Sequence, residues 1–181
     1  MNKNMLKGEK VYLRRLEQHD LDRTINWINN PEIFITMGLW GPRTQIEQQR
    51  WYERIAVSHT NIVFALCLSD TDEHIGNMSL FDIDLRNRNA GLTIIIPNEK
   101  FQGKGFGYEA VYLLCEYGFD YLNLNKIYCK TDNPHASKMY HKLGFVHEGT
   151  LRNQAFRFGK YVDKLIYGIL RTEFVKKNSK S

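Results

Sequence analysis

The sequence predicts a mixed α and β fold built on a mostly antiparallel central sheet. Three strand-like runs follow one another at residues 62–69, 74–84 and 90–96, and only the short turns DTDE and RNRN separate them. Two further apolar runs flank a turn at Gly159–Lys160, which predicts a hairpin near the C-terminus. Segments with helical spacing lie before and after these strands, so both element types contribute to the core.

Local start and stop signals place the remaining elements. Asp20 is positioned to cap a first helix, Thr44 with Glu47 forms the pattern of a capping box, and Gly144 is a natural helix end. The segment 29–44 is rich in turn residues and is expected to be irregular, but it is apolar enough to pack down or line a pocket. In order, the expected elements are a strand at 11–16, helices at 20–29 and 44–58, the three strands above, a helix at 105–121, a strand at 126–131, a helix at 133–145 and a hairpin at 147–171.

Length, charge and cysteine usage restrict the class of protein. The 181 residues show no linker or repeat, so we expect one domain over residues 1–181 with a flexible basic tail at about 176–181. The net charge of +5 suits an anionic ligand. No apolar run reaches the roughly 18 residues of a membrane span and no signal-peptide core is present, so a cytoplasmic protein without a membrane partner is expected. Cys67 and Cys129 lie in apolar runs and are expected to be buried, and the three cysteines lack metal-type spacing, so no metal is expected.

The stretch FQGKGFGYEAV, from Phe101 to Val111, is the strongest local signal of function. It places Gly103, Gly105 and Gly107 directly before an amphipathic run, although glycine is unfavourable inside helices. The N–H groups and the dipole of a helix start attract anions, and glycines remove the Cβ atoms that would keep an anion away. Because Lys104 adds a full positive charge, the loop predicts a site for a pyrophosphate.

Two common phosphate motifs do not fit this loop. A P-loop requires Gly-Lys-Ser/Thr, whereas Lys104 is followed by Gly105. A dinucleotide-binding fold requires G-x-G-x-x-G in a parallel βαβ unit, whereas the spacing here is G-x-G-x-G after hairpin-like strands. On the loop alone, a glycine-rich turn that lets a helix pack closely on a sheet is the alternative.

A second pattern some 30 residues later gives the loop its context. It reads N-x-x-x-S-x-x-Y-x-K-x-G-F and is formed by Asn133, Ser137, Tyr140, Lys142, Gly144 and Phe145. Together with the run III and the loop QGKGFG, it resembles the GNAT superfamily of acetyl-CoA-dependent N-acetyltransferases over about residues 75–170. The sequence is most similar to the bacterial branch with ribosomal-protein alanine, spermidine and amino-sugar acetyltransferases. The resemblance implies a sheet of about six to seven strands, about four flanking helices and a splay between strands 4 and 5.

The resemblance also assigns roles to residues of this chain. The run III matches the strand whose backbone binds the pantetheine arm of acetyl-CoA and polarises the thioester carbonyl. The glycine loop matches the pyrophosphate site, and the segment from Asn133 matches a second cofactor-binding segment. Tyr140 matches the proton donor to the departing thiolate. The implied cofactor-binding residues are Ile94, Ile95, Ile96, Gln102, Gly103, Lys104, Gly105, Phe106, Gly107, Asn133, Ser137 and Lys142.

Acetyl transfer requires groups of these kinds. An amine attacks the thioester, and backbone N–H groups at a strand edge can stabilise the oxyanion that develops. The thiolate of CoA must then gain a proton, and a tyrosine with a reference pKa of about 10 can donate it at neutral pH. For a tyrosine outside any motif, a place in the core of an amphipathic helix would be the simpler interpretation of Tyr140.

The sequence leaves the general base unassigned. Many relatives carry a glutamate on the strand before the loop, where this chain has Gly91. An alkyl ammonium with a pKa near 10 must lose a proton before it attacks. Glu32 is a candidate base, and an ordered water chain would also serve. Three histidines are weaker candidates and are expected to be exposed surface residues: His74, His135 and His141.

The amine acceptor is expected to contact the segment 29–44 and the stretch Phe156 to Tyr161. In the first segment the candidate substrate-binding residues are Glu32, Phe34 and Trp40. A polyamine would require several carboxylates, and Glu32 is alone there, so a protein N-terminus of the ribosomal-protein type or an anionic amino sugar is the expected acceptor. Spermidine or another small amine is the alternative. The arginines that would suit an anionic acceptor, unless they are simply solvated, are Arg43, Arg86, Arg88, Arg152 and Arg157.

Two other classes of function are alternatives to the enzyme. A sensor that binds CoA without turnover would share the loop, but the presence of Tyr140 argues against it. A nucleic-acid binder would need aromatics interleaved with Lys and Arg on one surface, and the charges here are scattered. Strand edges near the C-terminal hairpin could support a homodimer.

Overall fold

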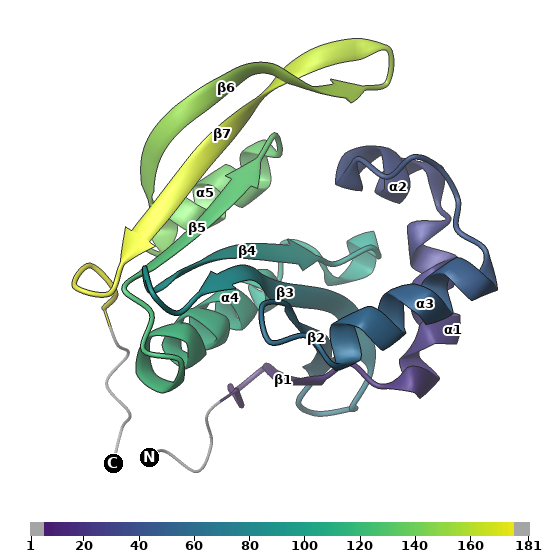
Figure 1. The fold of residues 1–181 in the computed structure, drawn as a ribbon, viewed down its shortest axis with the longest axis horizontal. Helices are drawn as coiled ribbons and strands as arrows, with labels where there is room; N and C mark the ends of the chain where they lie inside the picture. The colour runs from purple at the N-terminus through teal and green to yellow at the C-terminus, as the bar shows by residue number, and fades with distance from the viewer. Residues whose placement is uncertain (1–5, 176–181) are drawn as a thin grey trace.

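The computed structural model describes residues 6–175. Its strands form one seven-stranded sheet of order β1-β2-β3-β4-β5-β7-β6 (Figure 1). Of the neighbouring pairs, β4 and β5 are parallel and the others are antiparallel. The predicted fold class is therefore confirmed. The strands are β1 (Val11–Arg15), β2 (Ile62–Leu68), β3 (His74–Asp84), β4 (Asn89–Ile95), β5 (Lys126–Thr131), β6 (Val146–Arg157) and β7 (Lys160–Leu170).

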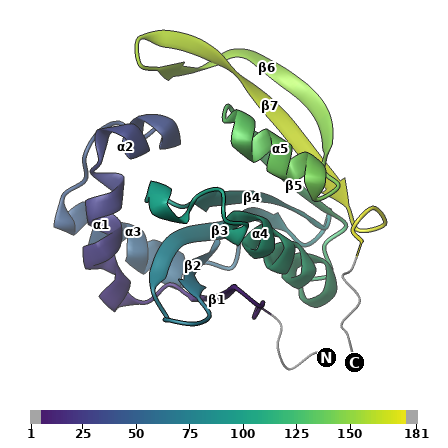
Figure 2. The same cartoon turned by 180° about the vertical axis from the view of Figure 1, so that it is seen from behind.

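Helices cover both faces of this sheet (Figures 1 and 2). On one face, α3 packs on a small cluster that includes Leu16, Val63 and Ala65. On the other, α4 contributes buried side chains to the main core. The helices are α1 (Leu21–Ile28), α2 (Pro31–Met37), α3 (Gln45–Ala56), α4 (Phe106–Glu116) and α5 (Pro134–Lys142).

The helix α2 corrects the expectation of an irregular segment. Asn30 caps it by accepting the Glu32 N–H at 2.9 Å, and Pro31 occupies its first position, where a missing N–H is harmless. Gly38 ends it with a φ of 72°. The turn residues that favoured an irregular chain are therefore the start and stop signals of a short helix.

Two of the predicted helix signals are confirmed, and a third acts differently. Thr44 and Glu47 form the capping box of α3. Gly144 follows the end of α5 with a φ of 91°. Asp20 precedes α1, but its carboxylate makes no cap and instead accepts two hydrogen bonds from the Arg14 guanidinium at 2.7 and 2.8 Å.

The Asp20 carboxylate organises a buried polar cluster that corrects the expectation for His74. His74 is 5% exposed, and its Nδ1 lies 3.2 Å from Asp20 while its Nε2 lies 2.8 Å from Asn77 Oδ1. Trp27 covers the imidazole edge-on at 4.9 Å. Burial lowers the pKa of His74, which keeps the ring neutral. The other two candidate histidines, His135 and His141, are exposed as expected.

Cys67 and Cys129 are buried, as predicted, and Cys115 is buried as well; all three are free. Within residues 6–175 no helix is long and apolar enough to cross a membrane. The same residues contain no group of His, Cys, Asp or Glu side chains that could hold a metal ion. The basic tail expected at 176–181 lies outside the described residues.

Candidate active site

β4 and β5 diverge after a short stretch of parallel pairing. The pairing covers three residue pairs and ends at Gly91 with Tyr128. Beyond this point β4 keeps β3 as a partner through Ile95, and β5 keeps β7 through Thr131, but no pair joins β4 to β5 in the described part of the chain. The edge of β4 that faces β5 can therefore offer its backbone to an extended ligand. This divergence is the predicted splay between strands 4 and 5.

The side chains of the three isoleucines point to two faces of the sheet. Ile94 and Ile96 pack against the main core, next to the first turn of α4. A Cβ added to Gly107 would lie 3.6 Å from Ile96 Cδ1 and 3.9 Å from Ile94 Cδ1. Ile95 instead lines a cavity on the opposite face. The strand at the splay and the glycine loop are therefore in direct contact.

The glycine loop has the backbone geometry that its composition predicted. Gly103 and Gly105 have φ values of 71° and 87°, which L side chains rarely adopt, and Gly105 is the N-cap of α4. No atom lies within 4 Å of a Cβ added at Gly103, so the loop is open toward solvent. Gln102 Nε2 donates to the Ile96 carbonyl at 2.9 Å and fixes the loop to the end of β4. The open helix start can therefore receive an anion.

Lys10 places a second ammonium group at this loop, and sequence reasoning did not identify it. Its Nζ donates to the Lys104 carbonyl at 3.3 Å. The Glu109 carboxylate accepts the backbone N–H groups of Glu9, Lys10 and Val11 at 2.9, 2.9 and 3.0 Å. These bonds fix the start of β1 to the first turn of α4. No local pattern could have shown this, because the partners lie about 100 residues apart in the chain.

The polar residues of the second pattern build and position α5. Asn133 Oδ1 caps the helix by accepting the N–H groups of His135 and Ala136 at 2.8 and 3.4 Å. Ser137 Oγ donates to the Asn133 carbonyl at 3.3 Å. Lys142 Nζ lies 5.3 Å from the centre of the Tyr108 ring of α4. These contacts hold α5 next to α4, with the helix start exposed.

Tyr140 lies on the inner side of α5 and is 4% exposed. Its ring packs between Phe145 and Tyr167, at centroid distances of 5.2 and 6.0 Å. Its hydroxyl forms a hydrogen bond with the thiol of Cys129, the first residue of β5 beyond the pairing with β4. Burial, and then the neighbouring Cys129, raise the pKa of Tyr140 well above its ordinary value. The hydroxyl therefore stays protonated and lies at the start of the splay.

The structure gives a physical reason for the absence of a glutamate at Gly91. A Cβ at this position would overlap the ring of Phe81. Phe81 also contacts Tyr128 edge-on at 6.1 Å, so aromatic rings fill the space beside the last paired residues of β4 and β5. A carboxylate cannot stand at position 91 in this arrangement.

A groove of about 880 Å³ lies between α2 and the far end of the β6–β7 hairpin. We call it the hairpin groove. β7 pairs with β5 only from Leu165 to Leu170, so the rest of the hairpin extends past the sheet toward α2 (Figure 1). Its lining residues include Phe34 and Trp40 from the N-terminal side, Phe156 and Phe158 from the hairpin, and the cations Lys130, Arg157 and Lys164.

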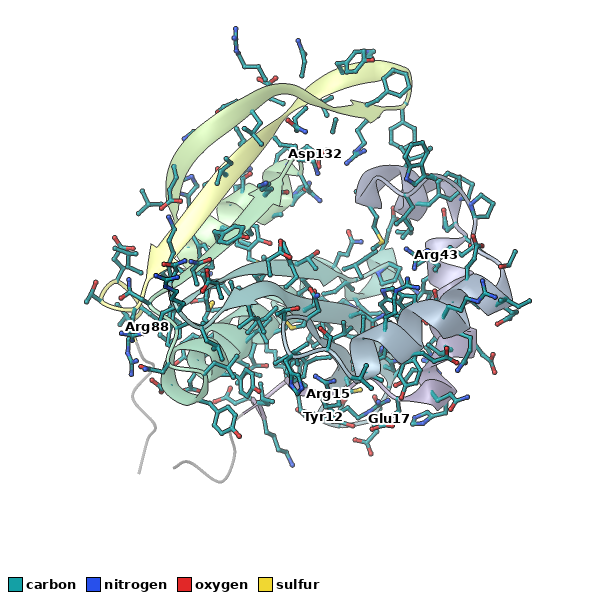
Figure 3. The ribbon with its side chains drawn as sticks, in the orientation of Figure 1. Tyr12, Arg15, Glu17, Arg43, Arg88 and Asp132 are labelled. Carbon is teal, nitrogen blue, oxygen red and sulfur yellow. The ribbon has the colours of Figure 1, made fainter. Side chains whose placement is uncertain are left out.

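Asp132, which follows β5 and is labelled in Figure 3, holds two of these cations. Asp132 pairs with Arg157 at 3.0 Å and with Lys164 at 3.4 Å, and all three side chains are mostly buried. Lys130 adds a third positive charge to the lining. The hairpin groove therefore carries more positive than negative charge.

A smaller cavity of about 130 Å³ lies between β3, β4 and the helices α1 and α3. We call it the inner cavity. Its walls are largely apolar and contain both Trp27 and Trp51. Met37 and Leu39 belong to the lining of both the inner cavity and the hairpin groove, so the two spaces adjoin.

Comparison with known proteins identifies this arrangement. Residues 10–146 match the family model described as an acetyltransferase (GNAT) domain. The chain belongs to the GNAT acetyltransferase family. It is therefore an acetyl-CoA:amine N-acetyltransferase, as the glycine loop and the second pattern indicated, and acetyl-CoA is its co-substrate.

Relatives of this GNAT enzyme cover nearly its whole length. An uncharacterized N-acetyltransferase of Bacillus licheniformis is 30% identical over 92% of this chain and 96% of its own. The spermidine N(1)-acetyltransferase of Vibrio cholerae is 32% identical over 94% of this chain and 99% of its own. A crystal structure of the spermidine N-acetyltransferase from Vibrio cholerae with CoA and spermine matches with a TM-score of 0.85, at 30% identity, over 92% of this chain and 98% of that one.

The GNAT fold brings some of the predicted acceptor residues together and separates others. Phe34 and Trp40 line the hairpin groove, whereas the exposed Glu32 lines neither space. Arg157 lines the groove and Arg43 lines the inner cavity. Arg88 lies at the other end of the molecule from Arg43, where it bonds to Asn123 (Figure 3). The remaining two arginines, Arg86 and Arg152, line neither space.

Proposed function

We propose that this GNAT enzyme transfers the acetyl group of acetyl-CoA to a primary amine by direct attack at the splay. The observation that carries the proposal is the separation of β4 from β5 beside both the glycine loop and the Tyr140 hydroxyl. The pantetheine arm would lie along Ile94–Ile96, where N–H groups of the strand edge can stabilise the oxyanion. The pyrophosphate would bind at Gln102–Gly107.

The charged and polar groups around the loop support this position for the cofactor. Lys104 is part of the loop and Lys10 Nζ bonds to its carbonyl, so two lysines and the helix dipole would act on the phosphates together. The exposed start of α5 would contact the cofactor through Asn133 and Ser137. Lys142, the last residue of α5, would contribute from its place beside Tyr108 of α4.

Tyr140 would protonate the thiolate of CoA as it leaves. Its raised pKa keeps the proton on the hydroxyl at neutral pH, so the proton would be available as the C–S bond breaks. Because a thiol has a reference pKa of about 8.5, the thiolate is a weaker base than the tyrosinate, and the proton that the amine loses would have to restore Tyr140. The amine must also lose a proton. Glu32 stays a candidate for that step, but its place outside both spaces favours transfer through ordered water.

A polyamine of the spermidine class is the acceptor that the relatives support. Two comparisons reach spermidine acetyltransferases at 30% identity or more over at least 92% of this chain. The expectation from sequence placed this class second. The hairpin groove has a volume of about 880 Å³, which is large enough for an extended amine.

A protein N-terminus or an anionic amino sugar is the second candidate, and the charge of the hairpin groove favours it. Lys130, Arg157 and Lys164 line the groove, and within residues 6–175 the carboxylate that pairs with them is Asp132, which binds Arg157 and Lys164. A polyamine with several ammonium groups would be repelled by this surplus, whereas a carboxylate or phosphate would be attracted.

The test is thiol release from acetyl-CoA with a panel of amines: spermidine, peptides with free Ala or Ser N-termini, and a nucleotide-linked amino sugar. Preferred turnover of spermidine would support the first acceptor, and preferred turnover of an acidic peptide or amino sugar the second. Tight CoA binding without turnover of any of these amines would leave two interpretations, an acceptor outside the panel or the CoA sensor. Sedimentation of the same sample tests the homodimer that exposed strand edges suggest.

A further inference from the structure

The inner cavity has the size and lining of a small-molecule site that the proposed reaction does not yet use. Its volume of about 130 Å³ is close to the roughly 150 Å³ of a cavity that accepts benzene. Apolar side chains provide most of its wall, and they include Trp27, Trp51, Val63 and Ile95. The space therefore suits one aromatic ring or a branch of four to five carbons.

One wall of the inner cavity carries a buried hydrogen-bond acceptor without a partner. Gln48 is 1% exposed, and its Oε1 has no hydrogen-bond partner among the described residues. Its Nε2 donates to Thr24 Oγ1 at 3.0 Å, and that hydroxyl donates in turn to the Leu21 carbonyl at 3.1 Å. The Thr24 hydroxyl donates its proton to Leu21, so toward Gln48 it can only accept. The group of Gln48 that faces Thr24 is therefore the amide nitrogen, which fixes the orientation of the amide. A buried carbonyl without a hydrogen-bond partner is unfavourable, so a ligand donor would be favoured there.

The charge of the lining restricts what that donor can be. Arg43 contributes a guanidinium, and no carboxylate is among the residues that line the cavity in residues 6–175. Burial lowers the pKa of Arg43, but an arginine stays charged at neutral pH. Glu47, the carboxylate that acts on Arg43, is exposed and lies outside the lining. An ammonium group in this cavity would therefore be buried beside the Arg43 guanidinium with no carboxylate in the lining to compensate its charge. The site therefore favours a neutral donor.

The position of the inner cavity connects it to the acceptor side of the splay. Met37 and Leu39 separate it from the hairpin groove. Thr93 and Ile95 of β4 form part of its wall, and β4 is the strand that borders the splay. An amine that enters from the hairpin groove would thus place its amino group at the splay and the rest of the molecule in the inner cavity.

We infer that the inner cavity is a specificity pocket for the acceptor amine. It accepts a neutral, largely apolar group with one hydrogen-bond donor, of the phenol class, which donates to Gln48 Oε1. The inference rests on the proposed acetylation of a primary amine. It adds amines with such a group to the candidate acceptors above, because spermidine and an anionic amino sugar carry none.

Direct binding of phenol tests the pocket without any turnover. Ligand-observed NMR titrations should show phenol binding to the full-length enzyme. Gln48→Met keeps the side-chain length but removes the acceptor oxygen, and should weaken binding about 3- to 10-fold, the range of one hydrogen bond. The matched control is Gln49→Met on the same helix, whose amide bonds only Glu53 in the described structure and should leave binding unchanged. Ser79→Leu fills the inner cavity while keeping Gln48, and it should abolish phenol binding. Because this second variant leaves Gln48 in place, the test does not depend on the folding of Gln48→Met alone.

Kinetics then assign the pocket to the acceptor. Tyramine and 2-phenylethylamine differ only in the phenol hydroxyl, so tyramine should have the higher kcat/KM in the wild type and in Gln49→Met, and this advantage should vanish in Gln48→Met. Phenol should compete with the amine. The inference would be overturned if Gln48→Met left the affinity for phenol unchanged. It would also be overturned if Gln48→Met weakened phenol binding but phenol did not compete with any amine. If no amine is acetylated although phenol binding depends on Gln48, the proposed function has failed, and the two failures are therefore distinguishable.

Discussion

In the proposed mechanism, Tyr140 combines a structural and a chemical role in one side chain. Its ring is part of the main core, while its hydroxyl reaches the thiol of Cys129 at the start of the splay. Burial raises the pKa of Cys129 to about 12, so this neighbour is a neutral thiol and does not compete for the proton. A core tyrosine and a proton donor, which looked like alternatives in the sequence, would be the same residue in the proposed mechanism.

Replacing Tyr140 with Phe should reduce kcat by about 10²–10⁴, the usual range for a lost general acid, with little change in the Kd of acetyl-CoA. The control is Tyr167→Phe, which removes a hydroxyl from the adjacent ring of the same cluster. Because the pKa of Tyr140 is raised, the acid limb of the wild-type pH profile should not come from this residue. Steady-state kinetics and calorimetry check both points, and an unchanged kcat would place the donor elsewhere.

At the scale of elements, buried charge pairs and special backbone positions hold the site together. The Asp20 cluster joins β1 to β3 through Arg14 and His74. Burial would raise the pKa of Asp20, but hydrogen bonds from Arg14 and the Glu17 N–H lower it to about 2. Gly105 lets the chain turn into α4 with a positive φ. Each is a place where one substitution should have a defined effect.

Asp20→Asn should destabilise the fold by about 3 kcal/mol at pH 7, because it leaves Arg14 partly buried without its counter-charge. The folded pKa of about 2 lies below the ordinary 3.8, so the carboxylate stabilises the fold above pH 4 and this contribution is lost as the pH falls toward 2. Urea unfolding at a series of pH values should show the difference between wild type and variant shrinking in that window. Asp22→Asn, an exposed change on α1, should show no such window.

Gly105→Val should abolish measurable binding of acetyl-CoA, because a β-branched side chain would cover the anion site and resist a φ of 87°. The backbone strain alone should cost about 1–2 kcal/mol. Gly159→Val places the same side chain at a φ of 82° in the β6–β7 turn and serves as the control for strain. If calorimetry gave both variants the wild-type Kd, the pyrophosphate site would have to lie elsewhere.

At the scale of the whole molecule, the acceptor region exists only because distant segments approach one another. Residues of α2 and of the β6–β7 hairpin, over 100 positions apart in the sequence, form the two sides of the hairpin groove. Asp132 neutralises part of the positive charge that the hairpin brings there. The balance of charge at this groove, rather than any single motif, should select the acceptor.

Arg157→Gln should therefore shift acceptor preference toward cationic amines. It removes one of the two partners of Asp132, so kcat/KM for spermidine should rise and that for an acidic peptide should fall, each about 3- to 10-fold for an interaction of about 1 kcal/mol. Arg50→Gln, on the exposed surface of α3, is the charge-matched control. Equal effects on both acceptors would show that Arg157 acts on the fold and not on selection.

The sequence alone determined the fold class, the pyrophosphate loop and the tyrosine donor as hypotheses, because each depends on local patterns. Alternation of apolar and polar residues between short turns predicts strands, and closely spaced glycines before a helix favour an anion site. Even the α2 helix, which we expected to be irregular, was encoded locally in Asn30, Pro31 and Gly38.

Only the tertiary structure decided which distant groups meet. It placed Lys10 at the loop through Glu109, buried His74 against Asp20, and covered Gly91 with Phe81. It also formed the two adjoining spaces on the acceptor side. These features depend on contacts between residues far apart in the chain, and no short-range pattern records such contacts because packing and charge compensation are set only once the sheet has assembled.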